Sequence, residues 1–191
     1  MQWGSTSREL GQELPGDSIL AGADLVATRT IGIKAPVSAV WPWLAQMGQG
    51  RGGLYSYDWL ENLVGCQMHS ANRIVAQWQE LSEGDDFRLH PEVALRVEQV
   101  DPPYALVVRG GVPASGSSDE GVAPYDFTWA FVLQPEEDNQ SRLVVRERYR
   151  YLTKWAPLLV EPVAAVSFIM TRKMMSGIRE RAEASPTPPP L

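Results

Sequence analysis

A long amphipathic segment near the C-terminus, residues 161–183, constrains the fold more than any other feature of this chain. Its apolar residues recur at the spacing of one helical face: Val166, Ile169, Met170, Met174 and Ile178. Nearly everything between residues 87 and 151 has the pattern of strands and sharp turns. A lone long helix beside a sheet has to bury its apolar stripe on that sheet. We therefore expect one helix on one sheet, with side chains or a ligand filling the seam between them.

Alternation of apolar and polar residues predicts six strands. They cover residues 24–33, 86–90, 93–100, 104–109, 126–133 and 142–151, separated by turn residues. Two short helices are expected after the first strand, one opening at Pro36 and one ending near Gly65. The predicted class is α+β, with an antiparallel sheet of about six strands.

The length of 191 residues favours a single domain, which we expect to span residues 23–184. Residues 1–22 are polar and contain several glycines. They are expected to form an N-terminal arm that lies on the surface and is partly ordered at best. Residues 185–191 are rich in proline, which indicates a disordered tail.

Charge and composition exclude several kinds of partner. The net charge of −6 argues against nucleic-acid binding, which needs a basic face. The single cysteine, Cys66, excludes an internal disulfide and a cysteine-based zinc cluster. No apolar run reaches the ~20 residues of a membrane span, and no signal peptide is recognisable. We expect a soluble, cytoplasmic monomer or weak homodimer that does not insert stably into membranes.

Residues 48–53 match the pattern G-x-G-x-x-G, but they follow a predicted helix rather than a strand. A dinucleotide-binding turn has to join a strand to a helix. The segment is better explained as a glycine-rich loop that presents Arg51, Tyr55 and Tyr57. These side chains either form the polar rim of a cavity or pack the loop onto a helix.

The two histidines, His69 and His90, fall on different predicted elements, so we expect no metal site. Cys66 and His69 have the C-x-x-H spacing of a thiol and its base. Nothing supplies the third group that would orient such a base, so nucleophilic catalysis is not predicted. No cofactor is expected.

Several longer runs carry a resemblance to a known family. They are VWPWLAQMGQGRGGLYSYD at 40–58, GD at 84–85, WAF at 129–131, MTRKM at 170–174 and GIRERAE at 177–183. With the order of elements, they resemble one bacterial branch of the START/Bet v1-like (SRPBCC) superfamily. The resemblance implies a helix-grip fold, in which a curved antiparallel sheet wraps around the long C-terminal helix. Because this fold hosts carriers, receptors and enzymes, it implies a kind of site rather than a reaction.

The last predicted strand has two contrasting faces. Arg142, Val144, Arg146, Arg148 and Arg150 share one face, which we expect to be solvated, and Leu143, Val145, Glu147, Tyr149 and Tyr151 share the other. Glu147 therefore points inward, where an unpaired carboxylate costs several kcal/mol. In a helix-grip sheet the first and last strands are neighbours, so the inward-facing Arg29 could meet it. That pair is either structural or a polar anchor of the site.

The resemblance implies a cavity between the sheet and the C-terminal helix. Its expected walls are Phe87, Trp129, Phe131, Tyr149, Met170 and Met174, and its expected polar contacts are Arg51, Tyr55, Tyr57 and Glu147. Loops 48–57 and 110–124 are expected to control access.

Three functions follow from these features. The first is binding of a small hydrophobic or amphipathic molecule. The second is a polyketide cyclase or dehydratase-like enzyme, in which Glu147 acts as acid or base with Tyr57 or Tyr149. The third and weakest is a filled-core interaction protein that uses Arg146, Arg148 and Arg150 to contact an acidic partner.

Overall fold

The computed structural model describes residues 2–63, 65–110 and 124–184. The strands are β1 (Gln2–Trp3), β2 (Leu25–Ile33), β3 (Asp86–His90), β4 (Val93–Asp101), β5 (Ala105–Gly110), β6 (Tyr125–Glu136) and β7 (Gln140–Tyr151). The helices are α1 (Ser7–Gly11), α2 (Val37–Ala45), α3 (Asp58–Leu63) and α4 (Ala156–Ala184), with a 3-10 turn at Ala76–Trp78.

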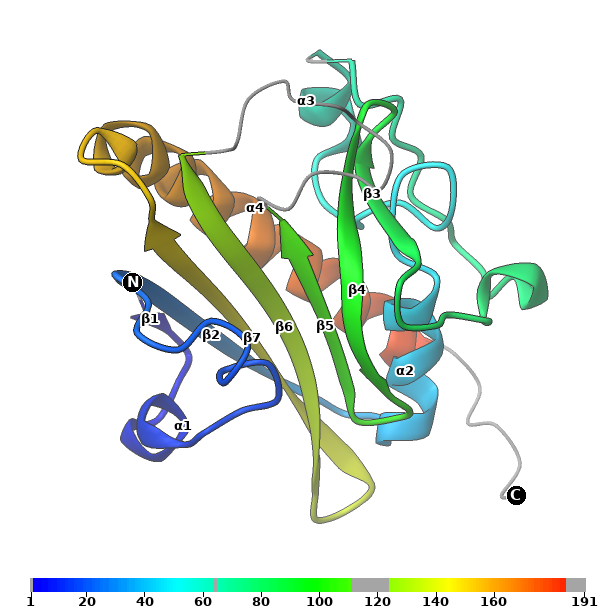
Figure 1. Cartoon of the computed structure of the whole chain (residues 1–191). Coiled ribbons are helices and arrows are strands. Elements are labelled where there is room, and N and C mark those ends of the chain that lie inside the picture. Colours follow the sequence, from blue (N-terminus) through cyan, green and yellow to red (C-terminus); the bar gives the residue numbers. More distant parts are fainter. Residues whose placement is uncertain (1, 64, 111–123, 185–191) are drawn as a thin grey trace.

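The strands form one open sheet in the order β1-β2-β7-β6-β5-β4-β3 (Figure 1). All neighbours are antiparallel except β1 and β2, which are parallel, so the sheet is mixed. The predicted α+β class and the two short helices after the first long strand are confirmed, and β1 adds a seventh strand. The tight β6–β7 turn places Asp138 and Asn139 at φ 56° and 58°, a backbone conformation that these short polar residues tolerate.

Helix α4 lies across the inner face of the sheet and is longer than the sequence indicates. Its C-terminal half packs on the core through Met174, Met175 and Ile178, each at most 1% exposed. In the N-terminal half the predicted stripe is wrong at Ile169, which is 60% exposed, whereas Val166, 55% exposed, borders the space between the helix and the sheet. Among the described residues, no helix is long and apolar enough to cross a membrane.

The buried residues in this N-terminal half of α4 are small. Ala156, Val160 and Ala164 recur four residues apart and are almost fully buried. Their small side chains let the helix lie close to the protein body, and this turns Ile169 away from the core. The helix therefore packs through small residues in its N-terminal half and through methionines in its C-terminal half.

After β1, which extends the edge of the sheet, residues 5–22 cover its outer face, on the side opposite α4 (Figure 1). Leu14 packs against Val132 and Val144, which point away from the main core. Helix α1 begins with a capping box, in which Thr6 and Glu9 bond each other's backbone and side chain. The expectation of a partly ordered arm is therefore replaced by a segment with its own strand, helix and cap.

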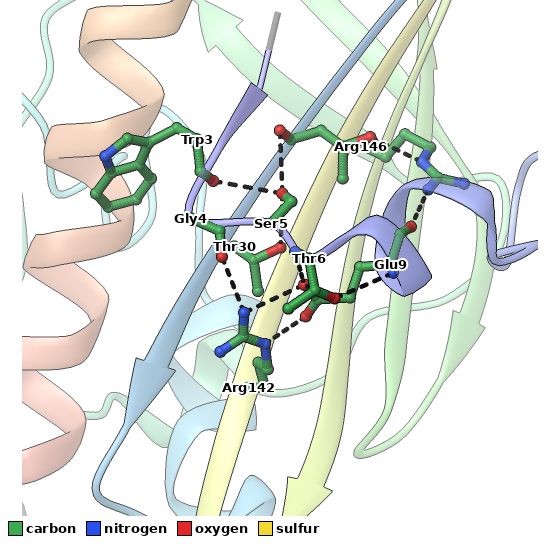
Figure 2. A network of polar contacts seen from close by, with 9 residues as sticks. Trp3, Gly4, Ser5, Thr6, Glu9, Thr30, Arg142 and Arg146 are labelled. Carbon is green, nitrogen blue, oxygen red and sulfur yellow. Dashed lines mark hydrogen bonds and ion pairs between the residues drawn. The ribbon is translucent and has the colours of Figure 1, made fainter.

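The arginines on the outer face of β7 hold this segment in place, as Figure 2 shows for Arg142 and Arg146. Arg142 bonds both carboxylate oxygens of Glu9, and Arg146 donates to the Glu9 backbone oxygen at 2.7 Å and contacts Asp17. Arg146 is only 3% exposed. The prediction of a solvated arginine face is wrong, because a segment far away in sequence covers it.

The two remaining outward arginines of β7 contact the same segment. Arg148 donates to the Leu20 oxygen at 3.2 Å and pairs with Asp17, and Arg150 donates to the Ala21 oxygen at 2.7 Å. The acidic partner imagined for this stripe is thus already supplied by Glu9 and Asp17 of the chain itself. This removes the main support for the interaction-protein hypothesis.

Candidate functional site

A pocket of about 800 Å³ lies between the N-terminal half of α4, the inner face of the sheet and α3. Helix α4 contributes Pro162, Val166, Ser167, Met170, Thr171 and Met174; the strands contribute Leu89, Val93, Ala94, Leu95, Gly110, Tyr125, Phe127, Trp129, Glu147 and Tyr149; α3 and its flanking loops contribute Leu54, Ser56, Leu60, Glu61 and Cys66. Most of this surface is apolar, and a few polar groups converge on it. That combination is typical of a small-molecule site.

Glu147 is the central polar residue of the sheet wall. It pairs with Ala27 on β2 and with Trp129 on β6, so neighbouring strands flank it on both sides. Its Oε1 lies 2.8 Å from Nη1 of Arg29, two residues further along β2. The contact expected from the strand faces is therefore present, and both side chains are almost fully buried.

Helix α4 also bonds this carboxylate. Ser167 and Thr171 donate hydroxyl hydrogen bonds to Oε1 of Glu147 at 2.9 and 3.1 Å. The other oxygen, Oε2, is buried and accepts no hydrogen bond from the described residues. One oxygen therefore holds the helix and the strands together, while the other has no partner of good geometry among the described residues.

Arg29 is held mainly by charge. Its guanidinium lies over the ring of Phe168, 5.1 Å from the centroid, and finds no hydrogen-bond acceptor of good geometry in the described part of the chain. A buried pair of this kind contributes little net stability, because desolvation offsets the attraction. Losing one partner is costly, because it leaves the other charge buried and uncompensated.

Two further polar groups face the pocket beside Glu147. Burial raises the pKa of Tyr149 far above its ordinary value, and the nearby Glu147 carboxylate adds to that shift. Its phenol therefore stays protonated at neutral pH and can donate a hydrogen bond. The indole Nε1 of Trp129 is also buried, and it has no acceptor among the residues described.

Glu61 is a second carboxyl group in the pocket, and sequence reasoning missed it. It is 3% exposed, and neither of its carboxylate oxygens is bonded by any described residue. Burial, helped by the like charge of Asp58, raises the pKa of Glu61 to about 7. In the sequence, Glu61 lies three residues after Asp58, which places the two carboxylates on the same side of α3. This spacing does not show whether that side faces the pocket or the solvent, because the helix is short.

Cys66 lines the pocket close to Glu61. Burial raises the pKa of the Cys66 thiol, and the charge of Glu61 raises it further. The thiol is thus disfavoured as a nucleophile, because the thiolate is the reactive form. Within the described residues, no cluster of three or more His, Cys, Asp or Glu side chains could hold a metal ion.

The structure separates the predicted site residues into three groups. Trp129, Glu147, Tyr149, Met170 and Met174 line the pocket. Phe87 and Phe131 lie behind this wall in the core, with Phe87 in edge contact with Trp129. Arg51, Tyr55 and Tyr57 are not part of the lining.

Arg51 and Tyr55 instead fasten the loop that follows α2. Arg51 donates to the backbone oxygens of Ala45 and Trp78. The hydroxyl of Tyr55 donates to the Trp43 oxygen at 3.1 Å and accepts from the Gln46 amide at 3.0 Å. The sequence left two interpretations of this loop open, a polar rim of the cavity or packing onto a helix, and the contacts of Arg51 and Tyr55 agree with packing.

A second loop, 110–124, was also expected to control access to the pocket. Residues 111–123 of this loop lie outside the described part of the chain.

Gly177 of α4 is the close-approach point for this loop. A Cβ added there would lie 2.3 Å from the backbone oxygen of Tyr55. Because only glycine leaves that space, the loop and the helix can meet directly. The loop after α2 therefore packs directly on the C-terminal half of α4.

Comparisons with known proteins find solved structures with a similar fold. No family model matches the chain, and no curated protein matches it in sequence. A solved structure from Nitrosomonas europaea matches with a TM-score of 0.53 and 13% identity, covering 83% of this chain and 94% of that one. A hypothetical protein from Helicobacter pylori matches with a TM-score of 0.51 and 13% identity, covering 89% and 95%.

A plant enzyme shows the same architecture. Norcoclaurine synthase from Thalictrum flavum matches with a TM-score of 0.50 and 13% identity, covering 84% of this chain and 87% of that one. At such low identity these likenesses concern the fold alone. The chain shares the architecture of these structures, a sheet that packs on a long C-terminal helix, and this is the fold that the sequence runs predicted.

Proposed function

We propose that this protein binds a small hydrophobic or amphipathic molecule in the pocket between α4, the sheet and α3. The observation that carries the proposal is the lining, which is mainly apolar and aromatic with a few buried polar atoms lacking partners in the described chain. Its volume of about 800 Å³ lies within the ~300–1,000 Å³ range of ordinary ligand sites. Burial of apolar ligand surface would supply most of the affinity, at ~25 cal/mol per Å².

Filling the pocket tests this proposal. Ala94 lines the pocket on β4, and Ala165 lies on the exposed side of α4 outside the lining. We expect the wild-type protein and Ala165→Trp to bind the neutral dye N-phenyl-1-naphthylamine saturably, with increased dye fluorescence. Ala94→Trp should lose this binding while remaining folded by circular dichroism. Equal binding by both variants, or no saturable binding by the wild type, would refute the proposal.

Native mass spectrometry of protein purified without denaturant provides a second test. A bound hydrophobic metabolite would appear as added mass and could be identified after denaturation. The Ala94→Trp variant should carry none of it, whereas Ala165→Trp should carry as much as the wild type. Equal loading of the two variants would place the metabolite elsewhere on the protein.

An enzymatic role of the cyclase or dehydratase kind is favoured by one specific observation. Oε2 of Glu147 is buried, and the protonated Tyr149 phenol lies within interaction range of this carboxylate. Such a carboxylate can remove a proton next to a ketone, while the phenol donates to the ketone oxygen. Tyr57, outside the lining, is a weaker candidate for that second role.

A linear 1,3,5-triketone tests this alternative, because its ring closure with loss of water can be followed by absorbance. Glu147→Asp keeps a negative charge for Arg29 while withdrawing the carboxylate from the pocket. An enzyme should lose turnover in this variant and in Tyr149→Phe, with dye binding retained. Absence of turnover in the wild type would leave the binding function as the proposal.

A further inference from the structure

Helix α3 has its polarity reversed. Trp59 and Leu63 are 67% and 74% exposed, whereas Glu61 between them is 3% exposed and lines the pocket. Burial strongly favours the tryptophan and leucine over a carboxylate. Leu60 lines the pocket as expected, but an unpaired carboxylate inside, with Trp59 and Leu63 outside, conflicts with the rule that governs the rest of the fold. Such local conflicts are typical of functional sites.

The two carboxylates of the pocket differ in how their charge is balanced. Glu147 lies 2.8 Å from Arg29 and accepts two hydroxyl hydrogen bonds. Glu61 has no donor in the described residues, and its charged neighbour Asp58 is also acidic. Asp58 is itself occupied by Ser70, which donates to both of its oxygens. The uncompensated charge of the pocket is therefore negative and lies at the α3 end.

We propose that Glu61 selects ligands that carry a protonated amine or a similar cationic group on an apolar body. This inference rests on the proposed binding function and names the chemical class of ligand for that same pocket. The apolar body would lie against Phe127, Trp129 and Met170, and the ammonium group would donate to the two free oxygens of Glu61. A fatty acid of the same length would place a second carboxylate beside Glu61 and would be rejected.

Three probes with the same chain isolate the contribution of the head group: decylamine, decanol and decanoate. By isothermal titration calorimetry at about pH 8, decylamine should bind the wild type about 10- to 100-fold more tightly than decanol, the range for hydrogen bonds to a charged group. Decanoate should bind more weakly than decanol. Glu61→Gln should abolish the preference for decylamine over decanol.

Lowering the pH provides a second readout, because protonation of Glu61 removes the charge that decylamine recognises. The other titratable groups facing this region are Asp58 on α3, Cys66 in the following loop, His90 on β3 near Gly65, and Glu147, Tyr149 and Tyr125 across the pocket. Only the part of the pH dependence that Glu61→Gln removes is assigned to Glu61. Glu180→Gln, a neutralised surface glutamate on the same chain, serves as the control and should behave like the wild type.

The outcomes distinguish this inference from the proposed function. If decanol binds but decylamine binds no better, or if Glu61→Gln weakens all three probes equally, the selectivity inference is overturned and the binding function stands. If decanoate binds as tightly as decylamine, the inference is likewise overturned. If no probe binds the wild type, the proposed function fails and the inference fails with it.

Discussion

Glu61 should make the protein less stable as the pH rises, even without a ligand. Its carboxyl has an ordinary pKa of 4.5 in the unfolded chain, and burial raises the pKa to about 7 in the folded protein. Between these two values the unfolded chain releases the proton while the folded protein retains it. The free energy of unfolding therefore falls with rising pH across this window and levels off above about pH 7.

The size of this effect follows from the two pKa values. A shift of one unit corresponds to ~1.36 kcal/mol, so the full shift from 4.5 to about 7 corresponds to roughly 3 kcal/mol. Between about pH 5 and pH 8, the part that remains to be lost is about 2.5 kcal/mol. Glutamine cannot titrate, so Glu61→Gln should gain about 2.5 kcal/mol relative to the wild type over this interval.

Urea denaturation followed by tryptophan fluorescence, repeated at several pH values, measures this difference. Comparing the two proteins cancels the contributions of the groups that both share. Glu180→Gln should instead run parallel to the wild type at every pH. A gap between wild type and Glu61→Gln that stays constant within ~0.5 kcal/mol would show that Glu61 is not the desolvated carboxyl described above.

Two further predictions concern Glu147 and Arg146, the buried charged residues of β7. Glu147→Gln should cost about 3–5 kcal/mol in unfolding free energy, because it leaves the Arg29 guanidinium charged and buried, and adding Arg29→Met should recover part of this loss. A cost below ~1 kcal/mol by urea denaturation would contradict the buried pair. Arg146→Met should cost about 2–4 kcal/mol and speed proteolytic cleavage within residues 2–22, because Arg146 bonds that segment at several buried points, whereas the exposed Arg150→Met should cost less than ~1 kcal/mol. Similar losses in the two arginine variants, or an unchanged cleavage rate in Arg146→Met, would show that Arg146 does not fasten the segment.

The fold and the inward face of β7 could be read from the sequence because strand alternation is a local signal. Once Leu143, Val145 and Tyr149 face the core, Glu147 has to face it too. The same rule turned Arg29 inward on β2, so their contact needed only the neighbouring order of the two strands. The aromatic wall around Trp129 follows from the same alternation on β6.

Residues whose place depends on packing between distant segments could not be read in this way. The arm that covers Arg146 is short, polar and without period, so nothing local shows which surface it will bind. Arg51 reaches the backbone oxygens of Ala45 and Trp78, and Tyr55 lies at the contact between its loop and α4, which exists because Gly177 leaves space there. Each of these contacts joins segments more than a hundred residues apart or joins a loop to a helix.

By itself, the sequence determined the α+β class, the strands from β2 to β7 and the carboxylate at position 147, because a two-residue period assigns each side chain to a face. Only the tertiary structure decided that Glu61 is inside and Trp59 outside, and that Ile169 is turned away from the core. A helix of six residues can present any side to its surroundings, and its burial is set by the surfaces it is docked between. The chemistry at the α3 end of the pocket is therefore a property of the assembled fold.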